Sequence, residues 1–454
     1  MTVFSTLSGG ARALSAHRAA AATASHNIEN ASTPGYARQR ATLETNPAEA
    51  IAPVGFIGTG VRVQGIAQAR DRFVEARLPA LFASAASSTA RSTALSAVTS
   101  FDPERGAKLS SRMSSFFAAM RELQVRPTDA ATRRAAVAAT DDLTRGFNAA
   151  GKDIENARRA IDSDLASRAP QVSQLLATVA DLNRSVKIAA AEGGGPPNDL
   201  LDQRQRAVDA VVQLTGAVVI PGDDGDVSLA LPSGESLVAG ESAAKISAAN
   251  DSTGRLTFTA QRPGGALKVI SNDAWGGTFG GSFSARDNDL GTAATSLDAT
   301  ADTVAAAINV AHASGFALDG STGRPLFTGS GARGIAVDPG IKNDPSLLQL
   351  SADPTRPGDA GNLITILSIE QSNPADALAN IVAIFGEASR AANIDAEANL
   401  DLLNHGLNLR ESVSGVSVDE ELVELQRAER SFQAAAKVIS TADQMLQTLL
   451  DLKP

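Results

Sequence analysis

Residues 25–39, which read SHNIENASTPGYARQ, mark the point where the chain changes its structure. Pro34 disfavours the α conformation for Thr33, the residue before it, so a helix that arrives from the N-terminal side must stop here. The Pro34–Gly35 pair is typical of a type II turn, because glycine tolerates the positive φ that this turn requires. The stretch therefore predicts a helix end, a tight turn and an extended segment that begins near Gln39.

The segment before this turn, residues 4–30, is predicted to be helical. Nine of the 21 residues from 11 to 31 are alanine, the residue that favours helix most strongly. Apolar and small residues recur at alternating spacings of four and three, which is the seam pattern of a coiled coil. Taken alone, this pattern favours an amphipathic helix on a globular core over a coiled coil. The seam positions are Leu7, Ala11, Leu14, Arg18, Ala21, Ser25 and Ile28.

The C-terminal end carries a second and longer seam. It keeps the four-three spacing for more than four heptads, which is long enough to predict a coiled coil. Matching seams at both ends predict that the two terminal helices pair, with the rest of the chain inserted between them. Its positions are Val418, Leu422, Leu425, Glu429, Phe432, Ala436, Ile439, Asp443, Leu446 and Leu450.

Between the two seams the sequence predicts long helices interrupted by a strand-rich segment. Helical periodicity runs from about residue 70 to 213, returns at 285–314 and resumes near 376, whereas residues 216–284 alternate in strand fashion between turn signals. The expected fold is mainly α with a β insertion. Residues 1–69 plus 411–454 are predicted to form an inner coiled-coil core domain with its connecting segment, 70–215 plus 285–410 an elongated helical domain, and 216–284 a small β-rich outer domain.

Composition excludes several classes of protein. The 454 residues include no cysteine, which rules out disulfides and thiolate metal sites. No segment approaches the roughly 18 apolar residues of a membrane helix, so no membrane insertion is expected. The net charge of −10 argues against a nucleic-acid partner, which would need clustered lysine and arginine. The N-terminus also lacks the basic and apolar regions of a cleavable signal peptide.

A search for catalytic or metal-binding residues finds no constellation. The four histidines are scattered, and no H-E-x-x-H, G-x-S-x-G, Walker A or Rossmann motif occurs. The glycines at 193–195 predict a flexible turn, and Asp223–Asp226 predicts a hairpin turn rather than a calcium loop. The charged group of Asp199, Asp202, Arg204 and Arg206 is most simply a salt-bridged helix surface. We therefore expect a protein that is not an enzyme and that has no cofactor, metal or catalytic site.

Four stretches together resemble a known family, the FlgK family of hook-associated proteins among the bacterial flagellar axial proteins. The 25–39 stretch resembles the family's N-terminal signature, and the run from Ser412 to Leu450 is similar to its C-terminal end. Residues 197–204 (PNDLLDQR) and the group Ile308, Asn309, His312, Gly315, Leu326 and Phe327 are similar to two internal landmarks. The sequence departs from the family pattern at Ala37, Gln205 and Phe432.

The resemblance implies a structural subunit at the junction between flagellar hook and filament, outside the cell, exported unfolded through the flagellar type III apparatus. The implied partners are other copies in a ring or helical assembly, the hook protein, a second hook–filament junction protein and an export chaperone. The terminal helices would pair as the inner core of a tube. The residues implied to shape that core or contact neighbouring subunits are Leu7, Leu14, Asn27, Ile28, Asn30, Pro34, Gly35, Tyr36, Arg38, Gln39, Leu422, Leu425, Phe432, Ile439, Leu446 and Leu450.

Three alternatives stay open at this point. Another axial component, such as a hook or distal rod protein, belongs to the same class, although residues 198–204 and 415–421 argue against it. A secreted adhesin that binds a host surface through the β insertion is a second alternative. A hydrolase that uses the Asp-rich loops is a third, and the lack of an acid–base pair disfavours it.

Overall fold

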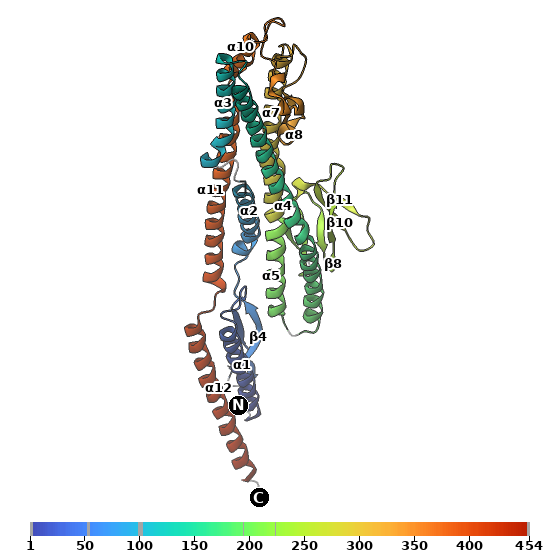
Figure 1. Cartoon of the computed structure of the whole chain (residues 1–454). Coiled ribbons are helices and arrows are strands. Elements are labelled where there is room, and N and C mark those ends of the chain that lie inside the picture. Colours follow the sequence, from blue (N-terminus) through green and yellow to red (C-terminus); the bar gives the residue numbers. More distant parts are fainter. Residues whose placement is uncertain (1–2, 52–54, 99–102, 194, 223, 452–454) are drawn as a thin grey trace.

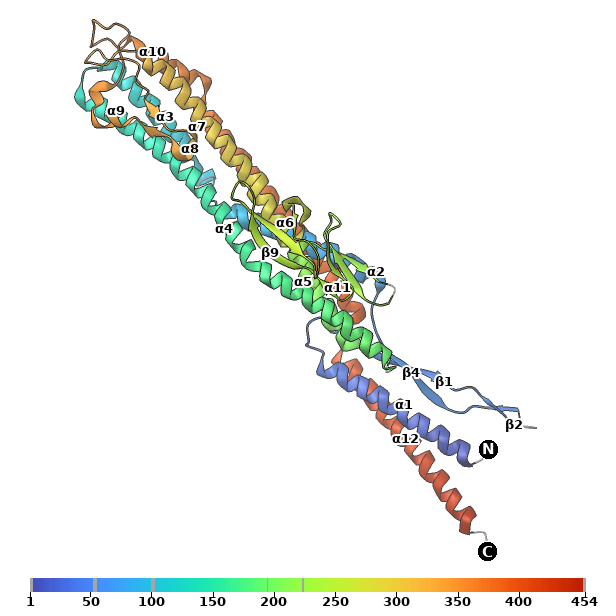
Figure 2. The ribbon, with the colours of Figure 1, turned by 90° about the vertical axis from the view of Figure 1, so that its right-hand side faces the viewer.

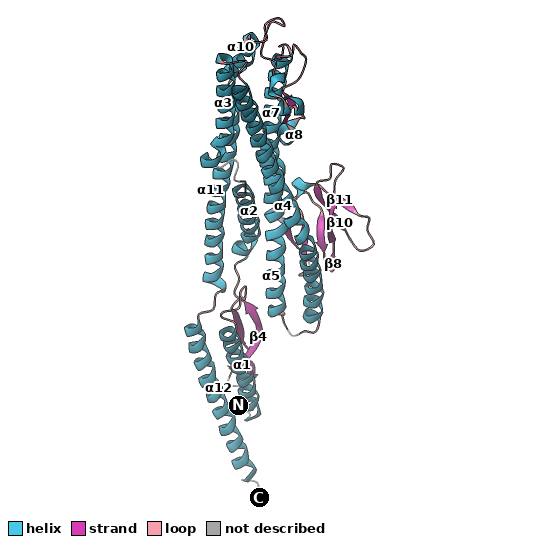
Figure 3. Cartoon of the chain, viewed as in Figure 1, coloured by secondary structure: helices cyan, strands magenta, loops and turns pink. Residues whose placement is uncertain are grey.

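The computed structural model describes residues 3–51, 55–98, 103–193, 195–222 and 224–451. The molecule is elongated, with both chain ends at one end of a long helical body and strands packed on the side of that body (Figures 1 and 3). Helices dominate, and the strands form only small antiparallel sheets. The predicted fold class, mainly α with a β insertion, is confirmed.

The terminal part of the molecule consists of two helices and a long hairpin. Helix α1 (Val3–Glu29) lies against α12 (Val418–Asp451), although almost four hundred residues separate them in sequence. Strands β1 (Gln39–Thr45) and β4 (Val61–Gln68) pair antiparallel and run along α1, with β2 (Glu49–Ile51) and β3 (Gly55–Ile57) beyond them (Figure 2). The extended segment predicted after the 25–39 turn is therefore one arm of this hairpin.

Long helices build the body. Their bounds are α2 (Arg72–Ser96), α3 (Pro103–Val125), α4 (Ala130–Ala191), α5 (Asn198–Thr215), α7 (Leu290–Ala313) and α11 (Pro374–Ser414). Helix α4 begins at Asp129, whose side chain accepts a hydrogen bond from the Thr132 N–H and so caps the first turn. Its buried stripe repeats every three or four residues, at Leu143, Phe147, Ala150, Ile154, Ala157, Ile161 and Leu165, so one face of α4 packs on the core.

The strands at 218–270 form two antiparallel sheets on the side of α4. Strands β5 (Val218–Pro221), β6 (Val227–Ala230), β7 (Ser236–Ala239) and β8 (Ser242–Ala243) make the first, in the order β5-β6-β7-β8. Strands β9 (Lys245–Asn250), β10 (Leu256–Gln261) and β11 (Lys268–Ile270) make the second, in the order β11-β10-β9. Their buried residues Leu229, Val238, Ile246 and Phe258 belong to the same hydrophobic core as α4.

The strand-rich segment ends earlier in the structure than in the sequence-based prediction. Strand β11 ends at Ile270, and helix α6 (Gly277–Phe283) follows, packed between α2 and α5. A Cβ on Gly216 would lie 2.4 Å from the Cα of Gly276. Two backbone segments meet closely there, which only glycine allows. The residues up to 284 that were predicted to be strand are therefore a tightly packed helix after residue 276.

The far end of the body is capped by short elements. They are β12 (Phe327–Thr328), α8 (Gly331–Gly334), β13 (Ala336–Val337), α9 (Pro339–Asn343) and α10 (Gly361–Ser368). The buried guanidinium of Arg133 donates hydrogen bonds to the carbonyls of Pro127, Pro345 and Leu348, which ties these loops to α4. In the described part of the chain, no helix combines the length and apolarity needed to cross a bilayer.

Candidate functional site

The signature residues lie where the terminal helices join the body. The turn that follows α1 is closed by a hydrogen bond from the Tyr36 N–H to the Thr33 carbonyl, with Pro34 and Gly35 at its two central positions. Gly35 has φ of 72°, as the second central residue of a type II turn requires. The backbone N–H and the side-chain NH₂ of Asn30 both donate to the His26 carbonyl, which closes the last turn of α1.

Asn27 is the centre of the signature. Its buried side chain uses the Nδ2 group to donate to the Gln39 carbonyl at 2.8 Å and to the Glu421 carboxylate at 2.9 Å. Its Oδ1 atom accepts from the Tyr36 hydroxyl at 2.7 Å and from the Gln39 N–H at 2.9 Å. One amide group therefore joins α1, the turn, β1 and α12, and its full hydrogen-bonding capacity is used.

Arg38 makes the second link to α12. Its guanidinium pairs with Glu421 at 2.6 Å and with Glu420 at 2.9 Å, and its backbone N–H donates to the Ser414 carbonyl at 2.8 Å. Glu421 is almost completely buried, so this carboxylate is compensated by Arg38 and Asn27 rather than by water. The first turn of α12 is therefore held against the start of β1.

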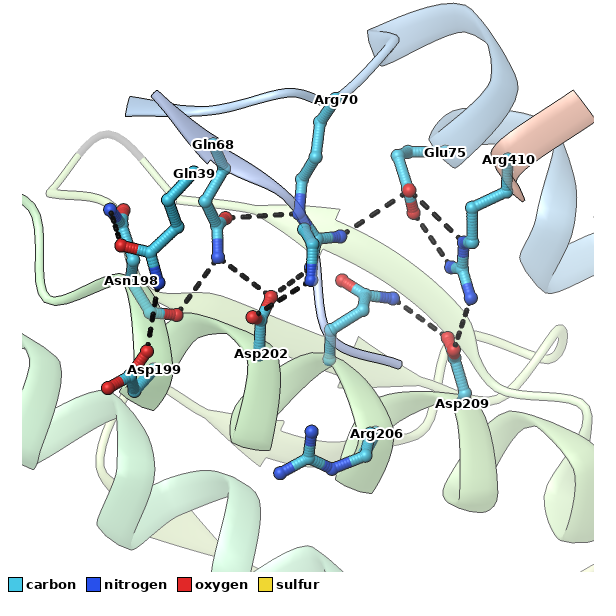
Figure 4. Close-up of polar contacts among 12 residues, drawn as sticks. Gln39, Gln68, Arg70, Glu75, Asn198, Asp199, Asp202, Arg206, Asp209 and Arg410 are labelled. Atoms are coloured by element: carbon cyan, nitrogen blue, oxygen red, sulfur yellow. Dashed lines mark hydrogen bonds and ion pairs between the residues drawn. The ribbon is translucent and has the colours of Figure 1, made fainter. Parts of the chain in front are cut away.

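A polar network on α5 fixes the same turn to the body (Figure 4). Asp202 is buried and accepts hydrogen bonds from Gln68 at 2.7 Å and Arg70 at 2.5 Å, as well as from the Ala37 N–H at 3.2 Å. The Gln39 side chain donates to Asp199 at 3.0 Å and accepts from Asn198 at 3.1 Å. The 197–204 landmark therefore provides the surface on which the signature docks.

Arg410 extends this network to α11. Its guanidinium contacts both oxygens of Glu75, at 2.8 and 3.1 Å, and Asp209 at 3.2 Å. Burial raises the pKa of Asp209, an effect that the neighbouring Arg410 opposes. The Tyr36 hydroxyl also has a raised pKa, first because of burial and then because of the negative charges of Asp199, Asp202 and Glu421. We call the twelve residues Asn27, Tyr36, Arg38, Gln39, Gln68, Arg70, Glu75, Asn198, Asp199, Asp202, Asp209 and Arg410 the joint cluster.

The joint cluster is suited to holding two parts of a molecule in a fixed orientation. Its carboxylates accept hydrogen bonds from amides and guanidinium groups. A cavity of about 280 Å³ beside it is lined by the 30–37 turn, Arg206, Asp209 and Arg410. Among the described residues, no three histidine, aspartate or glutamate side chains gather in a way that would hold a metal ion.

The pairing of the terminal helices uses smaller residues than the predicted seams. The buried small residues are Gly10, Ala16, Thr23 and Ala24 on α1, and Ala428, Ala435 and Ala442, seven residues apart, on α12. A Cβ on Gly10 would lie 2.6 Å from Ile439 Cγ1, so the helices approach closely there. Of the predicted seam residues, Leu7, Leu14, Ile28, Leu425, Ile439 and Leu446 are half-buried, whereas Leu422, Phe432 and Leu450 are exposed. Their role in subunit packing stays a prediction.

The structure brings most of the predicted signature residues together, and it adds several that the sequence did not single out. Asn27, Tyr36, Arg38 and Gln39 are in the joint cluster, whereas Pro34 and Gly35 are exposed on its turn. The sequence pattern did not identify five members of the joint cluster, which are Gln68, Arg70, Glu75, Asp209 and Arg410. On α5, Asp199, Asp202 and Asp209 follow one another at spacings of three and seven, so they share one helical face. That one-sided acidic row was the available signal.

Gly35→Ala should weaken the joint. The φ of 72° disfavours any residue with a Cβ, and the new atom would lie 2.9 Å from Arg206 Cγ. We expect a loss of about 1–2 kcal/mol in the stability of this region. Tyr36 is the only tyrosine, so its fluorescence, separated from that of the single tryptophan Trp275, follows the joint during urea unfolding. Gly58→Ala is the matched control, since its Cβ would meet nothing within 4 Å. Equal urea midpoints for the two variants would contradict this account.

Comparisons with known proteins match both parts of the molecule. The family model described as the flagellar hook-associated protein FlgK helical domain matches residues 95–327. The model described as the flagellar basal body rod FlgEFG protein C-terminal matches residues 410–452, which include α12.

Relatives match over most of the chain. The chain is 23% identical to flagellar hook-associated protein 1 of Salmonella typhimurium over 97% of this chain and 98% of that protein. It is 25% identical to the Bacillus subtilis protein of the same name, over 99% and 98% of the two chains. A solved structure, the flagellar hook junction protein FlgK from Burkholderia pseudomallei, superposes with a TM-score of 0.51 at 25% identity. That superposition covers 56% of this chain and 46% of the other.

Proposed function

This chain belongs to the FlgK family of flagellar hook-associated proteins, and we propose that its subunits polymerise on the tip of the hook and support the filament above them. It is a structural protein of the bacterial flagellum, and its function is that of a hook–filament junction protein. We infer that this role is mechanical rather than catalytic.

The joint cluster is the observation that supports this function best. A junction protein must transmit force between its inner tube and its outer body, so the connection between them has to be fixed. Here the connection is made by buried charged and amide groups on α1, α5, α11 and α12, with Asn27, Asp202 and Arg410 at its centre. Groups of this kind fix one orientation, because any other arrangement leaves a buried charge without a partner.

We propose the partners from the same role at the hook–filament junction. Copies of this chain would form a ring or helical assembly through the terminal helices, on which Leu422, Phe432 and Leu450 are exposed. The hook protein would lie on one side of this assembly and a second hook–filament junction protein on the other. An export chaperone and the flagellar type III apparatus would deliver the chain to the cell exterior, and a chain without cysteine can pass unfolded with no disulfide to reduce.

Electron microscopy of cells that lack the gene tests the position in the flagellum. We expect hooks without filaments, together with flagellin monomers in the culture medium, and restoration of filaments when the gene is supplied on a plasmid. Missing hooks would instead identify a hook or distal rod component. Intact filaments would contradict the proposed function altogether.

A further inference from the structure

The outward face of α11 is apolar and acidic. Ile384, Ile394, Leu402 and Leu409 are 65, 59, 54 and 41% exposed. Glu397 and Asp401 are also exposed on this helix, and neither carboxylate forms an ion pair with a described residue. Exposed apolar side chains that alternate with unpaired charges are typical of a protein interface rather than of a solvated surface.

The outward face of α4 has the opposite character. Arg134, Ala138, Arg145, Ala149, Lys152, Asn156 and Arg159 are all exposed and recur at spacings of three, four or seven, so they lie in one row. Of its basic residues, only Arg145 is ion-paired within the described chain, with Asp141 and Asp142. Because the alanine side chains in this row are short, another helix could approach α4 closely.

The two faces match in length and direction. Each row runs over 26 residues, 134–159 on α4 and 384–409 on α11, or about 38 Å of helix. Both α4 and α11 begin at the far end of the body and run toward the joint (Figure 1). Helix α3 contacts both α4 and α11, and the two views show α4 and α11 along different sides of the body (Figures 1 and 2). Neither row can therefore cover the other within one chain.

We propose that α11 of one subunit packs along α4 of a neighbouring copy, with the carboxylates of α11 facing the basic row of α4. This inference rests on the proposed function, in which copies assemble side by side with the same orientation, so the two helices would run parallel. The contact joins two different surfaces and so repeats around a ring or along a helix. It is a second interface, in the helical body, in addition to the one expected at the terminal helices.

Cysteine crosslinking tests the contact in assembled flagella, because the natural chain has no cysteine. Ala149→Cys on α4 is combined in turn with Ala391→Cys, Ala398→Cys or His405→Cys on α11, which samples three registers about 10 Å apart. We expect at least one combination to give a ladder of crosslinked multimers with a short bis-maleimide. Val310→Cys on α7 replaces the α4 cysteine as the control and should give at least tenfold less product. No ladder from any of the three combinations would overturn the proposal.

Charge reversal provides the second test. Lys152→Glu with Arg159→Glu, or Glu397→Lys with Asp401→Lys, should lower the amount of protein in isolated flagella at least tenfold. All four changes together should restore it to within threefold of the natural chain, whereas Lys245→Glu on β9 should have no effect. Thermal unfolding of each soluble variant checks that it folds.

Failure of the contact and failure of the proposed function give different results. If the natural chain itself is absent from flagella, the proposed function is wrong. If the natural chain is present but the variant with all four substitutions assembles no better than the double variants, the proposed contact between α4 and α11 does not form.

Discussion

The Asn27→Asp variant should fail to assemble, although it only exchanges an amide NH₂ for an oxygen. The natural Asn27 donates to the Glu421 carboxylate at 2.9 Å inside the protein. Aspartate would place a second carboxylate there, and two buried like charges at hydrogen-bond distance repel each other strongly. With the donor to the Gln39 carbonyl also lost, we expect the joint to be destabilised by about 3 kcal/mol or more. Recovery of the protein in isolated flagella should fall at least tenfold, together with motility in soft agar.

A substitution of Glu421, the residue that accepts a hydrogen bond from Asn27, provides the matched control. Glu421→Gln removes one charge and supplies an NH₂ group that can donate to an aspartate at position 27. The double variant Asn27→Asp with Glu421→Gln should therefore assemble better than Asn27→Asp alone. Glu421→Gln alone should itself be weakened, because its NH₂ group would face either the Asn27 NH₂ donor or the Arg38 guanidinium. A double variant no better than the single one would show that Asn27 does not act through Glu421. Normal assembly of Asn27→Asp would show that the buried amide is not needed.

The local structure of the signature could be predicted from the sequence, but its binding partners could not. Pro34 and Gly35 predict the end of α1 and the turn because these effects involve adjacent residues only. The groups that hold the turn lie far away in sequence, since Asp202 is 165 residues from Ala37 and Glu421 is 394 residues from Asn27. Periodicity identifies a helical face but does not say which other segment will cover it. For that reason Asp202 was assigned to a salt-bridged helix surface, whereas the structure buries it and pairs it with Arg70.

The seams of the terminal helices show the same limit of periodicity, which does not say which residues of a helix make its contacts. A four-three pattern of large apolar residues on α12 predicted Leu422, Phe432 and Leu450 at the helix pair. Within one chain the contact is made instead by Ala428, Ala435 and Ala442, because small residues allow α1 and α12 to approach closely. The pattern identified a coiled-coil type of helix correctly. It did not separate the face that pairs within the chain from the large residues left exposed beside it.

Acid should weaken the far end of the body through a single buried histidine, His312. Its Nδ1 atom lies 2.8 Å from the Arg324 carbonyl, and its Nε2 atom accepts a hydrogen bond from the Gln349 N–H at 3.0 Å. The ring is completely buried, and burial lowers the pKa of His312 to about 4. The hydrogen bond to the Arg324 carbonyl and the charge of Asp338 oppose this shift, whereas the charge of the Arg324 guanidinium adds to it. A second proton on the ring would turn the Nε2 acceptor into a donor facing another donor. The neutral ring is therefore the form that the fold requires.

The pH dependence follows from this shift. Because the pKa of His312 is lower in the folded chain than its ordinary value of 6.5, the unfolded chain binds more protons between pH 6.5 and 4. Stability from this group is present above pH 6.5 and decreases by about 3 kcal/mol as the pH falls to 4. Urea unfolding at pH 7.5, 6, 5 and 4.5 measures the loss, and His312→Gln is the control because its side chain does not titrate. The natural chain should lose more stability than the variant over this range, and equal losses would mean that the pKa of His312 is the same in the folded and the unfolded chain.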